Sequence, residues 1–133
     1  MTASLVFLHG WCCEADHFQD QMDYFSDSRE TLSIPWQSNL TGLDRPADLS
    51  LAASEIESSC LEASLTSPLV LIGHSMGGML AAMIAKRNQL DIKAIVVVDA
   101  TWPLDRKASD FFKSFIAGLE ADFAETIRSL QAH

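Results

Sequence analysis

The chain has 133 residues, of which 48% are hydrophobic and 20% charged, and its formal net charge is −9. This length fits one domain, and the composition is that of a globular protein rather than a disordered one. The acidic excess disfavours nucleic acid and anionic membrane surfaces as partners, because both are themselves negative. No membrane span is expected either, since every apolar run is shorter than about 18 residues.

The first part of the chain alternates short apolar runs with a helical pattern. Residues 4–9 (SLVFLH) are typical of a buried strand. Three apolar residues of the next segment recur at the spacing of one helical face: Phe18, Met22 and Phe25. Residues 31–36 (TLSIPW) predict a second short strand, which Pro35 ends.

A polar stretch with turn residues, 37–48, predicts a loop before the middle of the chain. A helix is expected over residues 46–64. Its inner face is predicted from apolar residues three or four apart: Leu49, Ala53, Ile56, Cys60 and Ala63. Residues 67–75 (SPLVLIGHS) then predict a strand, and residues 76–87 (MGGMLAAMIAKR) predict a helix whose basic end suits the helix dipole.

The last part of the chain predicts one more strand and a helical segment. Residues 93–100 (KAIVVVDA) are typical of a buried strand, and residues 105–130 of a helix that Gly118 divides in two. The helical segment has an apolar stripe made of Phe111, Phe112, Phe115, Ile116, Leu119, Phe123, Ile127 and Leu130. Apolar strands alternating with helices predict an α/β fold, in which helices cover both faces of a parallel sheet.

The strongest motif is Gly73-His74-Ser75-Met76-Gly77, which matches G-x-S-x-G. A strand before it and a helix after it are the context of a nucleophile elbow, in which a strained turn projects the serine hydroxyl above the sheet. The two glycines leave room where strand and helix cross. The Met76 amide then lies at the positive end of the helix, where an oxyanion would form. The alternative is a glycine-rich turn without chemistry.

A second element, His9-Gly10-Trp11, follows the first strand. An oxyanion hole needs a second N–H from a loop after a neighbouring strand, and the Trp11 amide is the candidate donor. By itself this tripeptide also fits a strand end with a packed histidine.

Together, VFLHGW, LIGHSMGGMLAA and IVVVDATWP resemble the N-terminal half of the α/β-hydrolase family, in particular its esterase-like and lipase-like members with a helical cap. The resemblance implies a truncated α/β-hydrolase fold of about four parallel strands, the family's third to sixth. It implies a partial core at residues 1–103 and a cap-like helical segment at 104–133. It also implies Ser75 as the nucleophile and the Met76 and Trp11 amides as the oxyanion hole.

The chain departs from the family by ending inside the cap region, before the strands whose loops hold the usual catalytic histidine and acid. Asp99 is the candidate acid, because some family members place the acid after the corresponding strand; the alternative is a residue that caps a turn. His9 is favoured over His17 as the candidate base. His74 adjoins Ser75 and points away from it, and His133 is the terminal residue. A base must come within about 3 Å of the serine, directly or through a water.

Two functions remain open from the sequence. The first is a carboxylesterase-like serine hydrolase for small apolar esters, with no cofactor and no metal. Without a well-placed base it would be slow, because an oxyanion hole and binding alone leave about 10³–10⁴-fold catalysis over water. The second is a non-catalytic fragment, or a binding or assembly domain of α/β-hydrolase origin.

Association and location are predicted from the same features. The strand at 93–100 would form an apolar sheet edge, and part of the stripe from Phe111 to Leu130 would be exposed. A homo-oligomer that buries one of these surfaces is expected, with helix packing within the chain as the alternative for the stripe. Cys12, Cys13 and Cys60 form neither a disulfide framework nor a metal-ligand spacing, which indicates a reducing compartment. Cys12 and Cys13 are expected to be small buried residues, with a thiol nucleophile as the alternative. The N-terminus lacks the basic start of a signal peptide, so a cytoplasmic location is expected.

Overall fold

A four-stranded parallel sheet, in the order β2-β1-β3-β4, organises the first 100 residues. The central strands are β1 (Ser4–Leu8) and β3 (Leu69–His74), and the edge strands are β2 (Thr31–Ile34) and β4 (Ile92–Val98). The register places Leu8, the last residue of β1, between Ile34 of β2 and Gly73 of β3. The carboxyl ends of these strands are therefore level, and the predicted parallel α/β sheet is confirmed.

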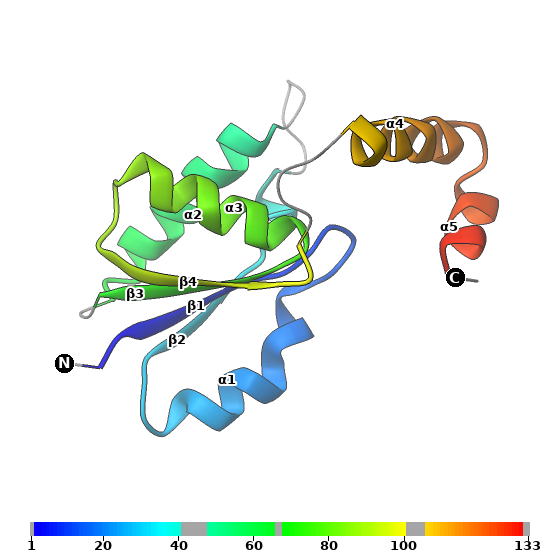
Figure 1. Ribbon diagram of the computed structural model, residues 1–133. Coiled ribbons are helices and arrows are strands. Elements are labelled where there is room, and N and C mark those ends of the chain that lie inside the picture. The colour runs from blue at the N-terminus through cyan, green and yellow to red at the C-terminus, as the bar shows by residue number, and fades with distance from the viewer. Residues whose placement is uncertain (1, 41–47, 66–67, 101–105, 132–133) are drawn as a thin grey trace. The chain divides into compact units, whose positions relative to one another are not determined.

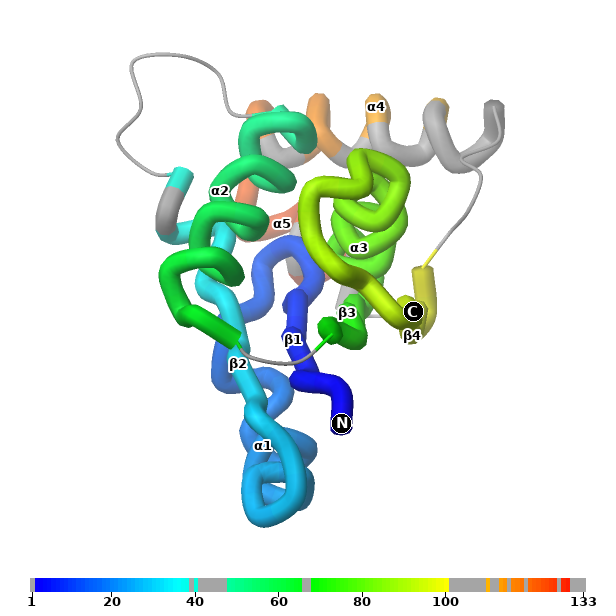
Figure 2. Tube along the Cα trace, turned by 90° about the vertical axis from the view of Figure 1, so that its left-hand side faces the viewer, coloured from blue at the N-terminus to red at the C-terminus, as the bar shows by residue number. Residues whose placement is uncertain are grey.

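Helices cover the two faces of the sheet (Figure 1). On one face lie α2 (Leu49–Glu62) and α3 (Met76–Arg87), and on the other lies α1 (Gln19–Ser26), an arrangement that Figure 2 shows from the side. Two short 3-10 helices, η1 (Ala15–Phe18) and η2 (Ser38–Leu40), follow β1 and β2. This layering follows from central strands that are apolar on both sides, because such strands are stable only when both faces are covered.

The structure, a computed structural model, describes residues 2–40, 48–65, 68–100 and 106–131. The chain divides into two compact units, residues 1–100 and 101–133. The expected boundary between residues 103 and 104 lies outside the described residues. None of the helices within the described ranges is both long enough and apolar enough to cross a membrane.

The second unit consists of two helices, α4 (Arg106–Ala121) and α5 (Phe123–Gln131). The predicted division at Gly118 is wrong, because α4 continues through Gly118 and the break comes at Asp122. There the carboxylate of Asp122 accepts a hydrogen bond from the Glu125 amide at 3.0 Å and so caps α5. A Cβ on Gly118 would lie 2.9 Å from the Thr126 hydroxyl, so this glycine allows the two helices to approach closely.

The inner face of α2 differs in part from the prediction. The helix begins after Asp48, whose carboxylate accepts from the Leu51 amide at 2.7 Å. Its buried residues are Ala52, Ala53, Ile56, Glu57 and Cys60. Ala63 is exposed rather than buried, because α2 has already ended at Glu62.

The core lies between the sheet and the pair α2 and α3. Its best-buried large side chains come from β1, β2, β3, α2 and α3: Val6, Leu8, Ile34, Ile56, Leu71, Leu80 and Ile84. On the face toward α1, the Phe7 and Phe18 rings pack with their centroids 5.1 Å apart. Burying each such side chain contributes about 1.5–3 kcal/mol to folding.

The prediction of a buried strand at residues 93–100 is wrong for β4. From Lys93 to Val98 every residue of β4 is exposed, whereas all five residues of β1 are buried. The reason is position, since β4 is an edge strand within the part of the chain that the structure describes. The separate prediction that this strand forms an apolar sheet edge is confirmed.

One ion pair joins α2 to α3 beside the core. An Arg87 guanidinium nitrogen lies 3.2 Å from Glu57 Oε2, and the guanidinium also donates to the Ser54 hydroxyl at 3.0 Å and to the Ser50 carbonyl at 3.2 Å. The Glu57 side chain is largely buried, and its other oxygen has no hydrogen-bond partner among the described residues. The Arg87 guanidinium therefore offsets the free-energy cost of burying the Glu57 carboxylate.

We expect Arg87→Met to lower the free energy of unfolding by about 1–3 kcal/mol, because it leaves the Glu57 carboxylate without a partner. Urea denaturation measures this loss. The double variant Glu57→Gln/Arg87→Met should lose less than the sum of the two single variants. A strictly additive double variant would contradict the coupling.

Candidate active site

The turn between β3 and α3 holds Ser75 in a conformation that residues other than glycine seldom adopt. Its φ is 51° and its ψ is −118°. The Ser75 amide donates to the Val98 carbonyl of β4 at 2.9 Å, which ties this turn to the neighbouring strand. The Ser75 hydroxyl makes no capping hydrogen bond to α3, although it occupies the N-cap position. Backbone strain of this kind costs about 1–3 kcal/mol and is concentrated at functional sites.

Glycines at both ends of the motif allow β3, α3 and β1 to cross at backbone distance. A Cβ on Gly73 would lie 2.3 Å from the Gly77 carbonyl oxygen. A Cβ on Gly77 would lie 2.0 Å from the Leu8 carbonyl oxygen and 2.7 Å from that of His9. Both positions are too crowded for any side chain, so the predicted need for glycine at Gly73 and Gly77 has a direct steric cause.

The loop after β1 lies against the Ser75 turn. A Cβ on Gly10 would lie 2.9 Å from Nδ1 of His74 and 3.3 Å from the Ser75 Cβ. The loop then turns back through a hydrogen bond from the Cys13 amide to the Gly10 carbonyl at 3.2 Å, with Cys12 at φ 58°. The structure thus brings the sequence elements HGW and GHSMG together, and it directs the His74 ring toward Gly10.

The His9 ring is held in a buried stack. The side chain is 2% exposed, and its ring lies 5.3 Å from the Trp36 ring in a stacked arrangement. Its Nδ1 lies 2.9 Å from the Gly10 carbonyl oxygen. Because a carbonyl only accepts, Nδ1 carries a hydrogen in this contact, and Nε2 is the ring nitrogen left for another partner. The Trp36 indole N–H donates to the His9 carbonyl at 3.0 Å. Trp36 therefore holds His9 by this hydrogen bond and by the ring stack.

Asp99 directly follows Val98, the residue whose carbonyl binds the Ser75 amide. It is exposed and has φ 48°. The next residue, Ala100, lies close to α3, since a Cβ on Gly78 would be 3.0 Å from the Ala100 Cβ. Asp99 and Ser75 therefore follow the carboxyl ends of adjacent strands and lie at the same end of the sheet.

Positive φ angles occur at two kinds of place, at helix ends and after the carboxyl ends of the strands. Among the described non-glycine residues, Ser64 and Asn88 have positive φ at the C-terminal ends of α2 and α3, where left-handed residues are common. The others, Cys12, Ser75 and Asp99, follow β1, β3 and β4. In parallel sheets ligands bind outside the carboxyl ends of the strands, which is where these three residues lie.

Two cavities open beside the loop after β1. One, of about 530 Å³, is mainly apolar and is lined by residues from five segments: Trp11, Trp36, Gln37, Leu40, Asp48, Leu49, Ala52 and Met76. The predicted oxyanion-hole residues Trp11 and Met76 thus line one cavity. The contribution of Trp36, Leu40 and Leu49 was not predicted, because they come from a loop and a helix start that local patterns do not bring together.

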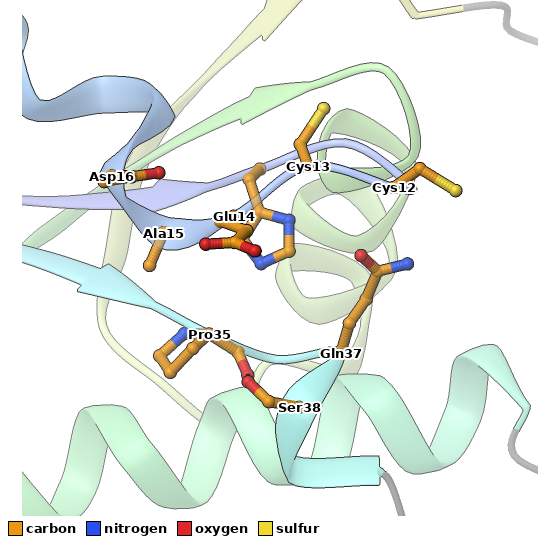
Figure 3. A pocket seen from close by; sticks show the side chains of 9 residues that line it. Cys12, Cys13, Glu14, Ala15, Asp16, Pro35, Gln37 and Ser38 are labelled. Atoms are coloured by element: carbon orange, nitrogen blue, oxygen red, sulfur yellow. The ribbon is translucent and has the colours of Figure 1, made fainter.

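The other cavity, of about 660 Å³, is more polar and includes His9 in its lining. Figure 3 shows Cys12, Cys13 and Glu14 on the side of the loop after β1, and Pro35, Gln37 and Ser38 on the side of the segment after β2.

The cysteines of this loop differ from the prediction of small buried residues. Cys12 is exposed and Cys13 is partly buried, because the turn at Gly10 projects them away from the core. Partial desolvation by the surrounding loop, and then the neighbouring Cys13, raise the pKa of the exposed Cys12 thiol, which disfavours a thiolate nucleophile. Burial, and then Glu57, raises the pKa of Cys60 to about 11.

Two further histidines are candidate bases in the sequence. His17 is exposed, and its Nδ1 accepts from the Glu14 amide at 3.5 Å at the start of η1. His133 lies outside the described residues. Nor do His, Cys, Asp and Glu side chains within the described ranges form a group of three that could hold a metal ion.

A family model described as the alpha/beta hydrolase family matches residues 5–132 of the chain. Solved structures with the same fold include an AqdC variant in complex with its substrate, the Pseudomonas quinolone signal, at 22% identity and a TM-score of 0.76, covering 98% of this chain and 49% of that one. A thermophilic esterase from Thermogutta terrifontis matches at 17% identity and a TM-score of 0.69, covering 92% and 46%. A Bacillus megaterium epoxide hydrolase matches at 19% identity and a TM-score of 0.63, covering 86% and 45%.

The chain spans about half the length of the solved structures that it matches. A search of curated proteins finds no match. The reactions of the three similar structures differ from one another, so the likeness establishes the fold and not a substrate.

We expect Gly77→Ala to destabilise the protein by about 3 kcal/mol or more, because its Cβ would strike the Leu8 carbonyl. In an unconstrained helix the same change would stabilise by about 1 kcal/mol. Urea denaturation followed by circular dichroism measures the change. Gly78→Ala is the milder comparison, since its Cβ would lie 3.0 Å from the Ala100 Cβ and 3.1 Å from the Gly73 carbonyl oxygen, against 2.0 Å from a carbonyl oxygen at Gly77. Equal stability of Gly77→Ala and wild type would contradict the close crossing.

Proposed function

The chain belongs to the alpha/beta hydrolase family, and on that premise we propose that it is a serine hydrolase that acts on carboxylic esters. The observation that carries this proposal is the backbone of Ser75, with φ 51° at the turn from β3 to α3 and a hydroxyl that does not cap the helix. A serine held in this way at high conformational cost is typical of a nucleophile elbow.

In the proposed reaction, Ser75 Oγ attacks the ester carbonyl carbon and its proton passes to a base. The carbonyl oxygen becomes an oxyanion that the Met76 and Trp11 amides stabilise. Each such donor is typically worth about 10²–10³-fold in rate. The carbon–oxygen bond to the alcohol then breaks, the alcohol leaves with the proton, and water hydrolyses the acyl-enzyme to the free acid. The loop after β1 lies so close that a Cβ on Gly10 would be 3.3 Å from the Ser75 Cβ, which supports this role for the loop.

We assign the acid to Asp99 and the base to His9. The adjacency of Asp99 to the Val98–Ser75 hydrogen bond supports the first assignment. For His9, the contact of Nδ1 with the Gly10 carbonyl leaves Nε2 as the ring nitrogen that would take the serine proton. The burial of His9 against Trp36 suits a packing role equally well, and experiment separates the two roles.

The substrate proposed for this site is a small ester with an apolar acyl group. The cavity of about 530 Å³ that Trp11 and Met76 line supports this choice, because tryptophan and leucine side chains dominate its wall. Asp48, in the same wall, disfavours acyl groups that end in a second carboxylate. The free cysteines Cys12, Cys13 and Cys60 support a reducing location such as the cytoplasm.

A second function is an assembly or binding domain without turnover. The buried His9 ring and the exposed apolar edge of β4 favour it. The nucleophile separates the two functions, because only an enzyme needs a reactive Ser75.

Ser75→Ala should lower the hydrolysis of p-nitrophenyl butyrate at least about 100-fold, because it removes the attacking oxygen. A fluorophosphonate probe should label Ser75 in the wild-type protein, and peptide mass spectrometry locates the label. Ser64→Ala is the matched control, since Ser64 also has positive φ but lies after α2. Unlabelled Ser75, with equal rates in wild type and Ser75→Ala, would leave the assembly function.

His9→Gln tests the base, because glutamine keeps a hydrogen-bond donor but cannot take the serine proton. For a base we expect a fall of about 10²–10⁴-fold in the rate of ester hydrolysis, with the melting temperature nearly unchanged. Parallel melting curves and rate measurements distinguish this outcome from packing. A lower melting temperature with the rate retained in the folded fraction would assign His9 to packing against Trp36.

A further inference from the structure

Gly10 separates two peptide groups of the loop that contributes to the proposed oxyanion hole, so this inference rests on the proposed function. The Trp11 amide belongs to the second group, the Gly10–Trp11 peptide. A side chain on Gly10 is excluded, because its Cβ would lie 2.9 Å from Nδ1 of His74 and 3.3 Å from the Ser75 Cβ. Glycine restricts its own φ and ψ less than any other residue. The two peptide planes therefore need contacts from elsewhere in the fold to fix their orientation.

The first peptide group, between His9 and Gly10, is held from the segment after β2. Its carbonyl oxygen accepts the hydrogen bond from the Trp36 indole N–H at 3.0 Å. The two side chains, of Trp36 and His9, are only 3% and 2% exposed. A hydrogen bond is electrostatically stronger in such surroundings than in water. Trp36 thus fixes the peptide plane that precedes Gly10.

The second peptide group is held through the His9 ring. The Gly10 carbonyl oxygen lies 2.9 Å from Nδ1 of His9 and also accepts from the Cys13 amide at 3.2 Å. The His9 ring is itself stacked on the Trp36 ring, with an angle of 19° between the ring planes. In a planar trans peptide the C=O and N–H bonds point in opposite directions. Contacts that fix the Gly10 carbonyl therefore also fix the direction of the Trp11 N–H.

Donation to the Gly10 carbonyl has an electrostatic effect as well. Hydrogen bonds in a chain polarise one another, so a peptide whose carbonyl accepts is a stronger donor at its N–H. These groups all lie between residues 9 and 36, inside the first compact unit. The arrangement therefore depends on contacts within that unit.

We propose that Trp36 is a positioning residue for the oxyanion hole and that it acts on the Trp11 amide through His9. Trp36 also lines the apolar cavity of about 530 Å³ together with Trp11 and Met76. An acyl group that fills this cavity packs against the side chain that orients the amide. Acyl binding is thereby coupled to stabilisation of the oxyanion, so binding energy is used where it raises kcat.

Nuclear magnetic resonance relaxation of ¹⁵N-labelled protein tests the positioning without any need for hydrolysis. In wild type the Trp11 amide should be as rigid as the amides of β1 on the ps–ns timescale. Trp36→Phe keeps a ring for the stack but loses the indole N–H, and it should make the Trp11 amide mobile. Leu40→Ala is the matched control, since Leu40 lines the same cavity but carries no hydrogen-bond donor, and it should leave this amide rigid.

His9→Gln is a second variant for the same measurement. It removes the contact of Nδ1 with the Gly10 carbonyl and should also loosen the Trp11 amide, so the proposal stays testable if Trp36→Phe does not fold. Melting curves establish which variants are folded. A Trp11 amide that is mobile in wild type, or one that stays rigid in the folded variants of Trp36 and His9, would overturn the proposal.

Kinetics with p-nitrophenyl butyrate measure the consequence for the proposed reaction. Trp36→Phe should lower kcat about 10-fold and change KM less than about twofold, because a misplaced donor matters mainly in the transition state. The inhibition constant of butaneboronic acid, whose tetrahedral adduct with Ser75 imitates the oxyanion, should rise by a similar factor. Leu40→Ala should instead raise KM, since it removes contact with the acyl group.

The outcomes distinguish this inference from the proposed function itself. A wild-type kcat with a raised KM in Trp36→Phe would make Trp36 part of the cavity wall alone and overturn its positioning role. Equal rates of hydrolysis in wild type and Ser75→Ala would contradict the hydrolase function, and the mobility of the Trp11 amide would still decide whether Trp36 positions it.

Discussion

The close crossing of three backbone segments at Gly73 and Gly77 is the constraint on which the rest of the site depends. Because Gly77 has no Cβ, α3 can begin against the carbonyls of Leu8 and His9 at the end of β1. Because Gly73 has none, β3 can pass directly under the first turn of that helix. The chain can join this strand to this helix only through a sharp turn, and Ser75 occupies that turn with positive φ. The strain at Ser75 is thus held in place by packing around it.

The other unusual features also lie at the carboxyl ends of the strands. The turn at Gly10, the positive φ of Cys12 and Asp99, and the cavity beside Trp11 and Met76 all lie after the carboxyl ends of β1, β3 and β4. The opposite ends of the strands meet the C-terminal ends of α2 and α3, where the positive φ of Ser64 and Asn88 belongs to ordinary helix ends. The unusual features are therefore gathered at one end of the strand axis, as is usual in sheets of parallel strands.

The sheet is also asymmetric across its width. β1 is buried on both faces between α1 and the pair α2 and α3, whereas β4 is exposed from Lys93 to Val98. Such a strand is apolar enough for a sheet centre but occupies an edge in the described residues. Its amide and carbonyl groups on the outer side, and its valine side chains, are the groups that gain most from a further strand. Val98 at the same time accepts a hydrogen bond from the Ser75 amide, so the edge strand is tied to the turn that holds the candidate nucleophile.

The sequence by itself determined the α/β layering, the positions of the strands and helices, and the place of the tight turn at Gly73–Gly77, because these depend on local periodicity and on a short glycine motif. The tertiary structure alone decided what lies beside them. It placed His9 in a stack with Trp36, 27 positions further along the chain, and left Cys12 exposed. It left β4 exposed, although the valines of this strand predict burial, because burial depends on which elements pack against a strand, and a local sequence pattern does not show that. It moved the helix break from Gly118 to Asp122, since a cap outweighs the modest cost of glycine inside a helix.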